Sequence, residues 1–398
     1  MLNFETYSPI NIPVNWQSEL IMDNEQRYSL LQKYLSPISS VVVKPNDWPV
    51  GYGSLEHDNL PVLYQPAAII EIPQLTNEQD VSHAQFYIYD NCLAVLNLRL
   101  KVDSDITNID DLAISKRIED LSEKYFAPIL KQLYSLKAEL PLMKPSDYKF
   151  FNNDIDELTN GKPLWVARML TQGKGLPAES YANWLKSVDS KTDYLQLGSG
   201  NSLLTEQQYF SDVNRIMIMS QFHVALMDRI ESLLKDNLKK FNINYYNKNK
   251  LASLGKTVTE QQYRNDHIEY INIQVSAATA GVQGKRRELL QQFNLAWGFT
   301  EQRERVDQLT DLTQARIDRS LQDKLRQQNR GIQTLLAFLG SLGLISLVID
   351  LASIEGEVNH KDTTGLLDLF NFISAESFIS LTAIIVILFT LYVYKNHE

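Results

Sequence analysis

The chain of 398 residues has a single cysteine, an uneven supply of proline and an excess of acidic over basic residues. One cysteine, Cys92, permits no intramolecular disulfide, which fits a reducing compartment. The formal net charge of −10 argues against direct binding of DNA or RNA, because phosphate backbones require a basic face. No P-loop, nucleophile elbow or histidine-rich ligand spacing is present, so we predict no enzyme, no catalytic residues and no assigned metal site.

Proline is confined to the first part of the chain. All 13 prolines lie at or before Pro177, and residues 178–398 contain none. Proline breaks helix interiors, so a long proline-free segment rich in Gln, Glu, Leu, Arg and Lys predicts helix. The chain therefore divides into a turn-rich N-terminal half and a helical C-terminal half.

The N-terminal half alternates short β-rich runs with helical spacing. The predicted strands are Ser40–Val43, Ala67–Ile72, Gln85–Tyr89, Leu93–Leu98, Leu164–Leu170 and Tyr194–Leu197. Asp90-Asn91-Cys92 predicts a hairpin between two of them. Helical spacing covers Ile109–Leu136, where Pro128 should kink or split the helix. We expect an α/β or α+β domain that ends near residue 200.

The segment Gly198-Ser199-Gly200-Asn201-Ser202 is predicted to connect a strand to a helix. Backbone amides at a helix start favour anions, so a phosphate-bearing ligand such as a small nucleotide would fit there. The ligand-binding candidates are Gly198, Gly200, Asn201, Ser202 and Arg168, with Trp165 beside them. The spacing matches neither the P-loop nor the dinucleotide fingerprint, and a flexible turn before a helix cap is the alternative.

The helical half contains one pentapeptide twice, at Thr205–Tyr209 and Thr259–Tyr263. Each places Thr at a potential N-cap and Gln three residues later, which predicts two helix starts. The first helix is expected to end near Phe241, after which 242–250 forms a turn. The second is expected to bend at Gly281 or Gly284.

Nothing interrupts the helical pattern from Thr300 through the first of two apolar runs. At 1.5 Å per residue, Thr300–Ile349 measures about 75 Å. A narrow apolar seam is predicted at Val306, Leu309, Leu312, Ile317, Leu321 and Leu325. Such a seam suits contact with a few neighbouring helices in an oligomer.

The two apolar runs are Gly331–Ile349 and Ser377–Tyr394, both without charge. A bilayer core of about 30 Å requires about 20 apolar helical residues, so both are predicted to span a membrane. Basic residues precede the first run and the connecting segment is acidic, which predicts that both termini lie in the cytoplasm. The expected location of the protein is the inner membrane of the cell. The predicted fold class is α+β: a cytoplasmic α/β domain, a long helical stalk and a two-helix transmembrane hairpin. The predicted parts are 1–200 (cytoplasmic domain), 201–330 (helical hairpin and stalk), 331–351 (first transmembrane helix), 352–376 (acidic outer loop) and 377–394 (second transmembrane helix).

This order of elements resembles the CorA family of divalent-cation channels and its two-span relatives. The resemblance covers the whole chain in layout and implies a homo-pentamer, with the first span as pore wall and the second facing lipid. That family carries Gly-Met-Asn at the outer end of its first span. Here Asp350–Gly356 reads Asp-Leu-Ala-Ser-Ile-Glu-Gly, and Gly-Met-Asn occurs nowhere in the chain. The family's filter therefore has no counterpart residue.

Small and polar residues mark two faces of the first span. The pore-lining candidates are Gln333, Ala337, Gly340, Gly343, Ser346 and Asp350, and the candidates for a hydrophobic gate are Leu336 and Leu339. Helical spacing places Gly343, Ser346 and Asp350 on one face and Gln333, Ala337 and Gly340 on another. The sequence leaves open which face would meet the axis.

Three functions are consistent with these patterns. The first is a homo-oligomeric channel gated by its cytoplasmic domain, which the resemblance extends to antiviral membrane effectors of the CRISPR type opened by a nucleotide messenger. The second is a transporter of magnesium, cobalt or nickel ions. The third is a membrane-anchored scaffold that does not conduct. No cofactor is certain; a divalent cation and a nucleotide are the candidate ligands, and the lipid bilayer is the expected partner.

Overall fold

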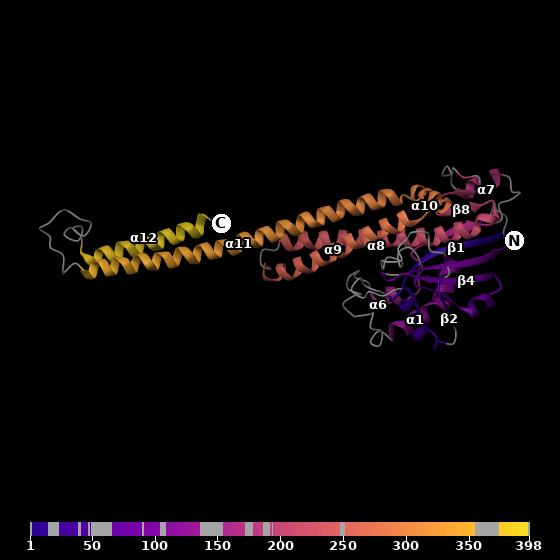
Figure 1. The fold of residues 1–398 in the computed structure, drawn as a ribbon, viewed down its shortest axis with the longest axis horizontal. Helices are drawn as coiled ribbons and strands as arrows, with labels where there is room; N and C mark the ends of the chain where they lie inside the picture. Colours follow the sequence, from indigo (N-terminus) through magenta and orange to yellow (C-terminus); the bar gives the residue numbers. More distant parts are fainter. Residues whose placement is uncertain are drawn as a thin grey trace. The chain divides into compact units, whose positions relative to one another are not determined.

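The computed structural model is an α+β protein with an N-terminal sheet domain and a C-terminal helical region (Figure 1). It describes residues 2–14, 24–38, 41–46, 48, 66–89, 91–103, 109–135, 154–171, 178–185, 192, 194–246, 251–354 and 374–396. The chain forms two compact units. The first combines 1–250 with 260–314, and the second combines 251–259 with 315–398.

One sheet organises the first unit, with the strand order β2-β3-β4-β5-β1-β6-β8-β7 among the described residues. The strands are β1 (Leu2–Asn11), β2 (Val42–Lys44), β3 (Ala68–Glu71), β4 (Val81–Ile88), β5 (Leu93–Val102), β6 (Ala167–Leu170), β7 (Leu195–Leu197) and β8 (Asn201–Leu204). The β6–β8 pair is parallel and the other pairs are antiparallel. Strand β1 lies near the middle, between β5 and β6.

The hairpin between β4 and β5 confirms the prediction around Asn91-Cys92, and Asp90 lies outside the described residues. Asn91 and Cys92 both adopt positive φ angles, of 57° and 59°, as the tightest hairpin turns require. Cys92 is buried and carries a free thiol. Residues Leu2–Asn11 were not predicted as a strand, because Pro9 argues against a central position. Pro9 is tolerated because β6 pairs only with Phe4–Tyr7.

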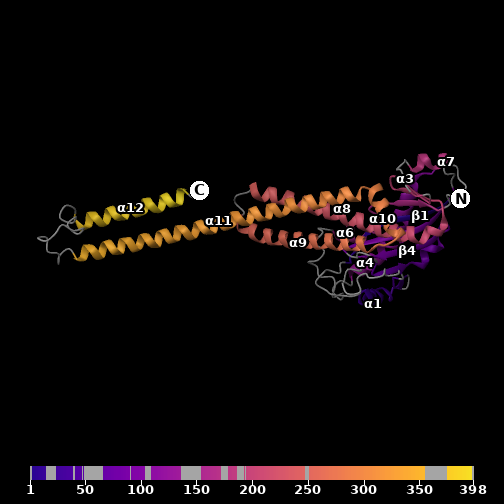
Figure 2. The same ribbon diagram turned by 45° about the horizontal axis from the view of Figure 1, so that its top comes forward.

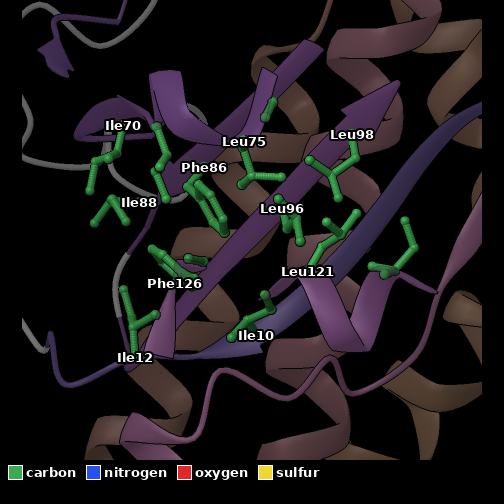
Figure 3. Packing of buried hydrophobic residues seen from close by; sticks show 14 of the residues in the cluster. Ile10, Ile12, Ile70, Leu75, Phe86, Ile88, Leu96, Leu98, Leu121 and Phe126 are labelled. Carbon is green, nitrogen blue, oxygen red and sulfur yellow. The ribbon is translucent and has the colours of Figure 1, made fainter. Parts of the chain in front are cut away.

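Each face of the sheet buries a separate apolar core. The first core packs against α1 (Asn24–Leu35), η1 (Pro73–Asn77), α3 (Asp111–Tyr125), α4 (Ala127–Ser135), α6 (Ile155–Thr159) and α7 (Ala178–Leu185). Figure 3 shows its centre, where Phe86 of β4 stacks on Phe126 with ring centroids 3.7 Å apart. Phe126 separates α3 from α4, and Pro128 lies at the start of α4, which confirms the predicted split.

The second core lies between the other face of the sheet and the long helices α8 (Phe210–Tyr246), α9 (Leu251–Gly281), α10 (Lys285–Ala296) and the start of α11 (Phe299–Ile354). Tyr89 stacks on Phe222 of α8 with ring centroids 4.0 Å apart. The apolar stripe of α8 is thus packing, as its spacing predicts. Helix α9 ends at Gly281 and α10 follows Gly284, so the predicted bend is a complete break.

Of the two helix starts predicted at the repeated pentapeptide, the first is confirmed, with its N-cap one residue later than predicted, and the second is wrong. The 3-10 helix η5 (Gln207–Tyr209) follows its N-cap Glu206 and leads directly into α8 at Phe210. The amide of Thr205 donates to the carbonyl of Tyr194 at the end of the β7–β8 hairpin. The second copy, Thr259–Tyr263, lies inside α9, which begins at Leu251. Helix α8 also continues to Tyr246 through part of the predicted turn, whose remainder, 247–250, lies outside the described residues. Strong helix propensity on both sides of the second copy overrides its capping signal.

Helix α11 confirms the uninterrupted helix expected from Thr300 through the first apolar run. The predicted apolar seam is only partly correct. Val306 and Ile317 are buried, but Leu312 and Leu325 are exposed. The buried seam instead includes Gln302, Thr310, Thr313 and Ser320.

Among the described residues, α11 is the one helix long and apolar enough to cross a membrane by length and composition. The second apolar run lies in α12 (Ala375–Asn396), whose apolar stretch Glu376–Leu388 is shorter. Helix α12 runs back beside the C-terminal part of α11 in the opposite direction (Figures 1 and 2). Most of the predicted outer loop, 355–373, lies outside the described residues.

A charged cluster holds α3 against the turn before β4, and we expect it to make the stability pH-dependent. Lys124, Tyr125 and Arg117 lower the pKa of Glu78 to about 2, and Arg117 also lowers the pKa of Asp80. Because carboxyls with lowered pKa values stabilise the fold only while ionised, stability should fall as the pH drops from about 5 towards 2. Urea midpoints measured across this range should show a shallower fall for Glu78→Gln than for the unaltered chain. Equal slopes would contradict the assignment.

Candidate functional site

The predicted strand–loop–helix at Gly198–Ser202 is wrong. Gly198-Ser199-Gly200 is the turn of the β7–β8 hairpin, in which the Gly198 amide donates to the Asn201 carbonyl over 2.7 Å. Asn201 and Ser202 belong to β8. No helix starts in this segment, so no converging helix amides are available there for an anion.

The structure nevertheless brings three of the predicted ligand-binding residues together. Arg168 of β6 lies opposite Asn201 of β8, and its Nη1 donates to Asn201 Oδ1 over 3.2 Å. Arg168 Nη2 donates to the carbonyl of Asp111 over 2.9 Å and to the Ser115 hydroxyl. The hydroxyl of Ser202 donates to the carbonyl of Arg168. Burial lowers the pKa of the Arg168 guanidinium, and Asp111 opposes that effect.

The carboxylate of Asp111 is the centre of this cluster, although the sequence did not single it out. It accepts from Trp184 Nε1 and from Asn201 Nδ2, each over 2.9 Å, and lies 3.9 Å from Arg168 Nε. Asn201 Nδ2 also donates to the carbonyl of Trp184 over 3.0 Å. We call Asp111, Ser115, Arg168, Trp184 and Asn201 the clasp. It joins α3, α7, β6 and β8.

The clasp is suited to holding α3, α7, β6 and β8 together and not to binding phosphate. Its guanidinium faces a carboxylate, a hydroxyl, an amide and a carbonyl of the protein itself. Trp165 does not complete a pocket there, because its Nε1 donates to Gln221 of α8 and its ring packs against the core on the other face of the sheet. The predicted nucleotide site at Gly198–Ser202 is therefore not supported.

A second buried charge lies on β1, which the sequence did not identify as a strand. Glu5 is fully buried and accepts from Arg99 Nε and, over 3.3 Å, from Asn97 Nδ2. Burial raises the pKa of Glu5, and Arg99 opposes that effect. The ring of Phe210, at the start of α8, covers the guanidinium of Arg99 at 5.2 Å. These contacts bury the carboxylate of Glu5, while the side chain of Arg99 stays 37% exposed.

An open pocket of about 500 Å³ lies beside the end of β1, between α6 and α8. Its lining residues include both signs of charge and two side-chain amides: Asn11, Glu157, Asn160, Lys162, Pro163, Leu164, Arg229, Ser232, Leu233 and Asp236. Arg229 donates to the carbonyls of Asn91 and Cys92 and to the Asn11 amide oxygen, which ties α8 to the β4–β5 turn. In the part of the chain that the structure describes, no group of three His, Cys, Asp or Glu residues could hold a metal ion.

The pore-lining candidates on α11 fall on two faces that differ in exposure. Ser341 is buried, and Thr334, Ala337 and Ile345 are half-buried. At 3.6 residues per turn these four form one stripe, and α12 runs beside this part of α11 (Figure 2). The predicted candidate Ala337 therefore lies on the less exposed stripe.

The opposite side of the helix carries Leu336, Leu339, Gly343, Ser346 and Asp350, all exposed. We call these five residues the open face. Leu336 and Leu339 are the predicted gate residues. Gly343, Ser346 and Asp350 are one of the two predicted pore-lining groups. Gln333 and Gly340 are exposed beside it.

Comparison with models of protein families, with curated proteins and with solved structures gave no match. The resemblance to CorA channels therefore stays a prediction from the layout of the chain.

Proposed function

We propose that this protein is a membrane-embedded homo-oligomer that conducts ions and is gated by its large cytoplasmic domain. One observation carries the proposal. Between Gly331 and Ile349, α11 holds nine large apolar side chains that are each 45–61% exposed: Ile332, Leu335, Leu336, Phe338, Leu339, Leu342, Leu344, Leu347 and Ile349. These residues surround most of the helix, and Ser341 is the one buried side chain described in this run.

Water is a poor solvent for such a surface. Burial of one leucine-sized side chain is worth about 1.5–3 kcal/mol. Soluble monomers rarely expose contiguous apolar patches larger than a few hundred Å². A hydrocarbon core about 30 Å thick matches the length of this uncharged run. A bilayer accounts for the exposure along the whole run.

The placement of charge gives the orientation. Arg316, Arg319, Lys324, Arg326 and Arg330 precede the apolar run within α11. Such residues are retained on the cytoplasmic side, so the sheet domain belongs in the cytoplasm under this proposal.

The open face of α11 supports a channel over a simple anchor. Side chains that face only lipid are normally large and apolar, as on the exposed side of α12 with Leu381, Ile384 and Ile385. The open face instead includes a glycine, a hydroxyl and a carboxylate. Repeated around an axis, Leu336 and Leu339 would form an apolar constriction and Asp350 a ring that attracts cations.

Divalent-cation transport is the second candidate function. Asp350 favours it, since a ring of exposed carboxylates concentrates divalent cations. A non-conducting scaffold remains as an outcome of the experiment below. A nucleotide at Gly198–Ser202 is not part of the proposal, because the polar side chains of Arg168 and Asn201 bond to other residues of the clasp.

Ion flux from liposomes that contain the purified full chain tests the proposal. We expect potassium efflux from the unaltered protein, and Leu339→Ala should raise the basal efflux by about tenfold, because a shorter side chain widens the apolar constriction. Ile384→Ala on α12 is the matched control and should leave efflux unchanged. Absence of efflux from a preparation of correct oligomeric mass would favour the scaffold. Efflux of magnesium alone would favour the transporter.

A further inference from the structure

A buried polar layer crosses the bundle that α8, α9 and the first part of α11 form within the first unit. Asn237 of α8, Asn265 of α9 and Thr313 of α11 are each only 1% exposed. Each helix contributes one residue. We call these three residues the polar layer.

Hydrogen bonds between the helices show that the three residues share one level of the bundle. Asn265 Nδ2 donates to Gln314 Oε1 over 3.0 Å, next to Thr313. Arg264, which precedes Asn265, donates to Asn237 Oδ1 over 3.4 Å. The polar layer therefore lies across the bundle and not along one helix.

On one side of the layer the interior is apolar. Ile268, Ile271 and Val275 of α9 and Val306 of α11 are at most 2% exposed and belong to the second core. The polar layer occupies inward-facing positions of the same helices, where apolar residues would otherwise continue this core. An amide at such a position lowers stability relative to leucine.

One buried acceptor of the layer also has no donor. Asn265 Oδ1 is buried and has no hydrogen-bond partner among the described residues. Thr313 cannot supply one, because its hydroxyl donates to the carbonyl of Leu309 within α11. A buried acceptor without a partner keeps its full cost of desolvation. Water entering the layer would remove that cost.

Control of helix register does not explain the layer. A buried Asn fixes register where separate chains can slide. Here the helices are parts of one chain, and two further contacts fix α9 against α11: Asn272 with Asp307, and Arg303 with Ser276. The register is thus specified without the layer.

We infer that the polar layer is the point at which α11 loosens from α8 and α9, and that this opening regulates conduction. The inference rests on the proposed channel function. Opening hydrates Asn265, which lowers the free-energy difference between the packed and loosened states. Helix α11 continues without a break to the open face. Weaker packing of α11 against α8 and α9 therefore affects the same helix that carries the proposed pore residues.

The test replaces the layer in the full chain by Asn237→Leu, Asn265→Leu and Thr313→Val together. Amide hydrogen exchange of 261–268 and 309–314 should slow by about tenfold, because the packed state no longer contains an unpaired acceptor. Asn265→Leu alone, which removes the unpaired acceptor and keeps Asn237 and Thr313, should slow exchange by about threefold and guards against a triple variant that packs poorly. Gln262→Leu replaces an exposed amide of α9 outside the layer and should leave exchange of these segments unchanged.

The same variants in potassium-loaded liposomes separate the two proposals. We expect the triple variant and Asn265→Leu to lower efflux, the former by at least about fivefold, while Gln262→Leu conducts like the unaltered chain. Unchanged exchange in both layer variants would overturn the inference, and so would slowed exchange with unchanged efflux. If the unaltered protein shows no efflux, the channel proposal fails, whereas the exchange result still reports whether the layer opens.

Discussion

Alanine at position 198 is expected to prevent the native packing of the β7–β8 hairpin. A Cβ at this position would lie 1.8 Å from the carbonyl oxygen of Leu185 and within 3 Å of two other backbone atoms of that residue. Backbone at the end of α7 cannot rotate away as a side chain can. Ordinary overpacking costs about 1–3 kcal/mol, and an overlap with fixed backbone should exceed that range.

Gly200, two residues away in the same turn, provides the control. It has a φ of +81°, and no atom lies within 4 Å of the position that a Cβ would take. Gly200→Ala should therefore cost only the backbone strain of a positive φ, about 1 kcal/mol. Urea unfolding of both variants, followed by tryptophan fluorescence and circular dichroism, measures the difference. Equal losses of stability would show that Leu185 does not limit the approach of the turn.

The sequence was informative where the signal is local. Pro128 separates α3 from α4, and Asn91-Cys92 closes the β4–β5 hairpin, because each feature depends on the backbone preferences of a few residues. The long helix from Thr300 was predictable for the same reason. It contains no proline and many residues of high helix propensity.

Strand β1 was not predictable, because its burial depends on distant partners. Phe4 pairs with Leu100 on one side and Leu170 on the other. Glu5 and Pro9 each argue locally against a central strand. Arg99 compensates the charge, and the end of the β6 pairing accommodates the proline. Only the assembled sheet contains these compensations.

The candidate site was half predicted for a related reason. Arg168, Asn201 and Ser202 were singled out correctly as neighbours, but the segment was expected to start a helix. Asn201–Leu204 pairs with β6 and β7, and this pairing overrides the local preference for a turn. Asp111 was missed, since its neighbours Arg168, Trp184 and Asn201 are at least 57 residues away in sequence. No local pattern contains that information.

Removal of the Asp111 carboxylate is expected to be the most damaging single change within the clasp. Asp111→Ala would leave Trp184 Nε1 and one donor of Asn201 without their acceptor, and would leave Arg168 without its counter-charge. Trp184 and Asn201 are both buried. A buried donor that loses its partner costs about 1–3 kcal/mol, so two such donors should lower the free energy of unfolding by about 3 kcal/mol or more.

The preceding residue is a control of the same chemical type. Asp110 caps α3 by accepting from the amides of Leu112 and Ala113, and its side chain is exposed, so Asp110→Ala should cost about 1 kcal/mol. Urea unfolding compares the two variants. A double-mutant cycle of Asp111→Ala with Asn201→Ala should show a coupling of at least about 1 kcal/mol, because both changes remove the same contact. A carboxylate that joins α3 to three other elements must couple energetically to the residues that it contacts. Additive effects in the cycle, or equal losses of stability for Asp110→Ala and Asp111→Ala, would therefore mean that only the N-cap and the apolar face hold α3 in place.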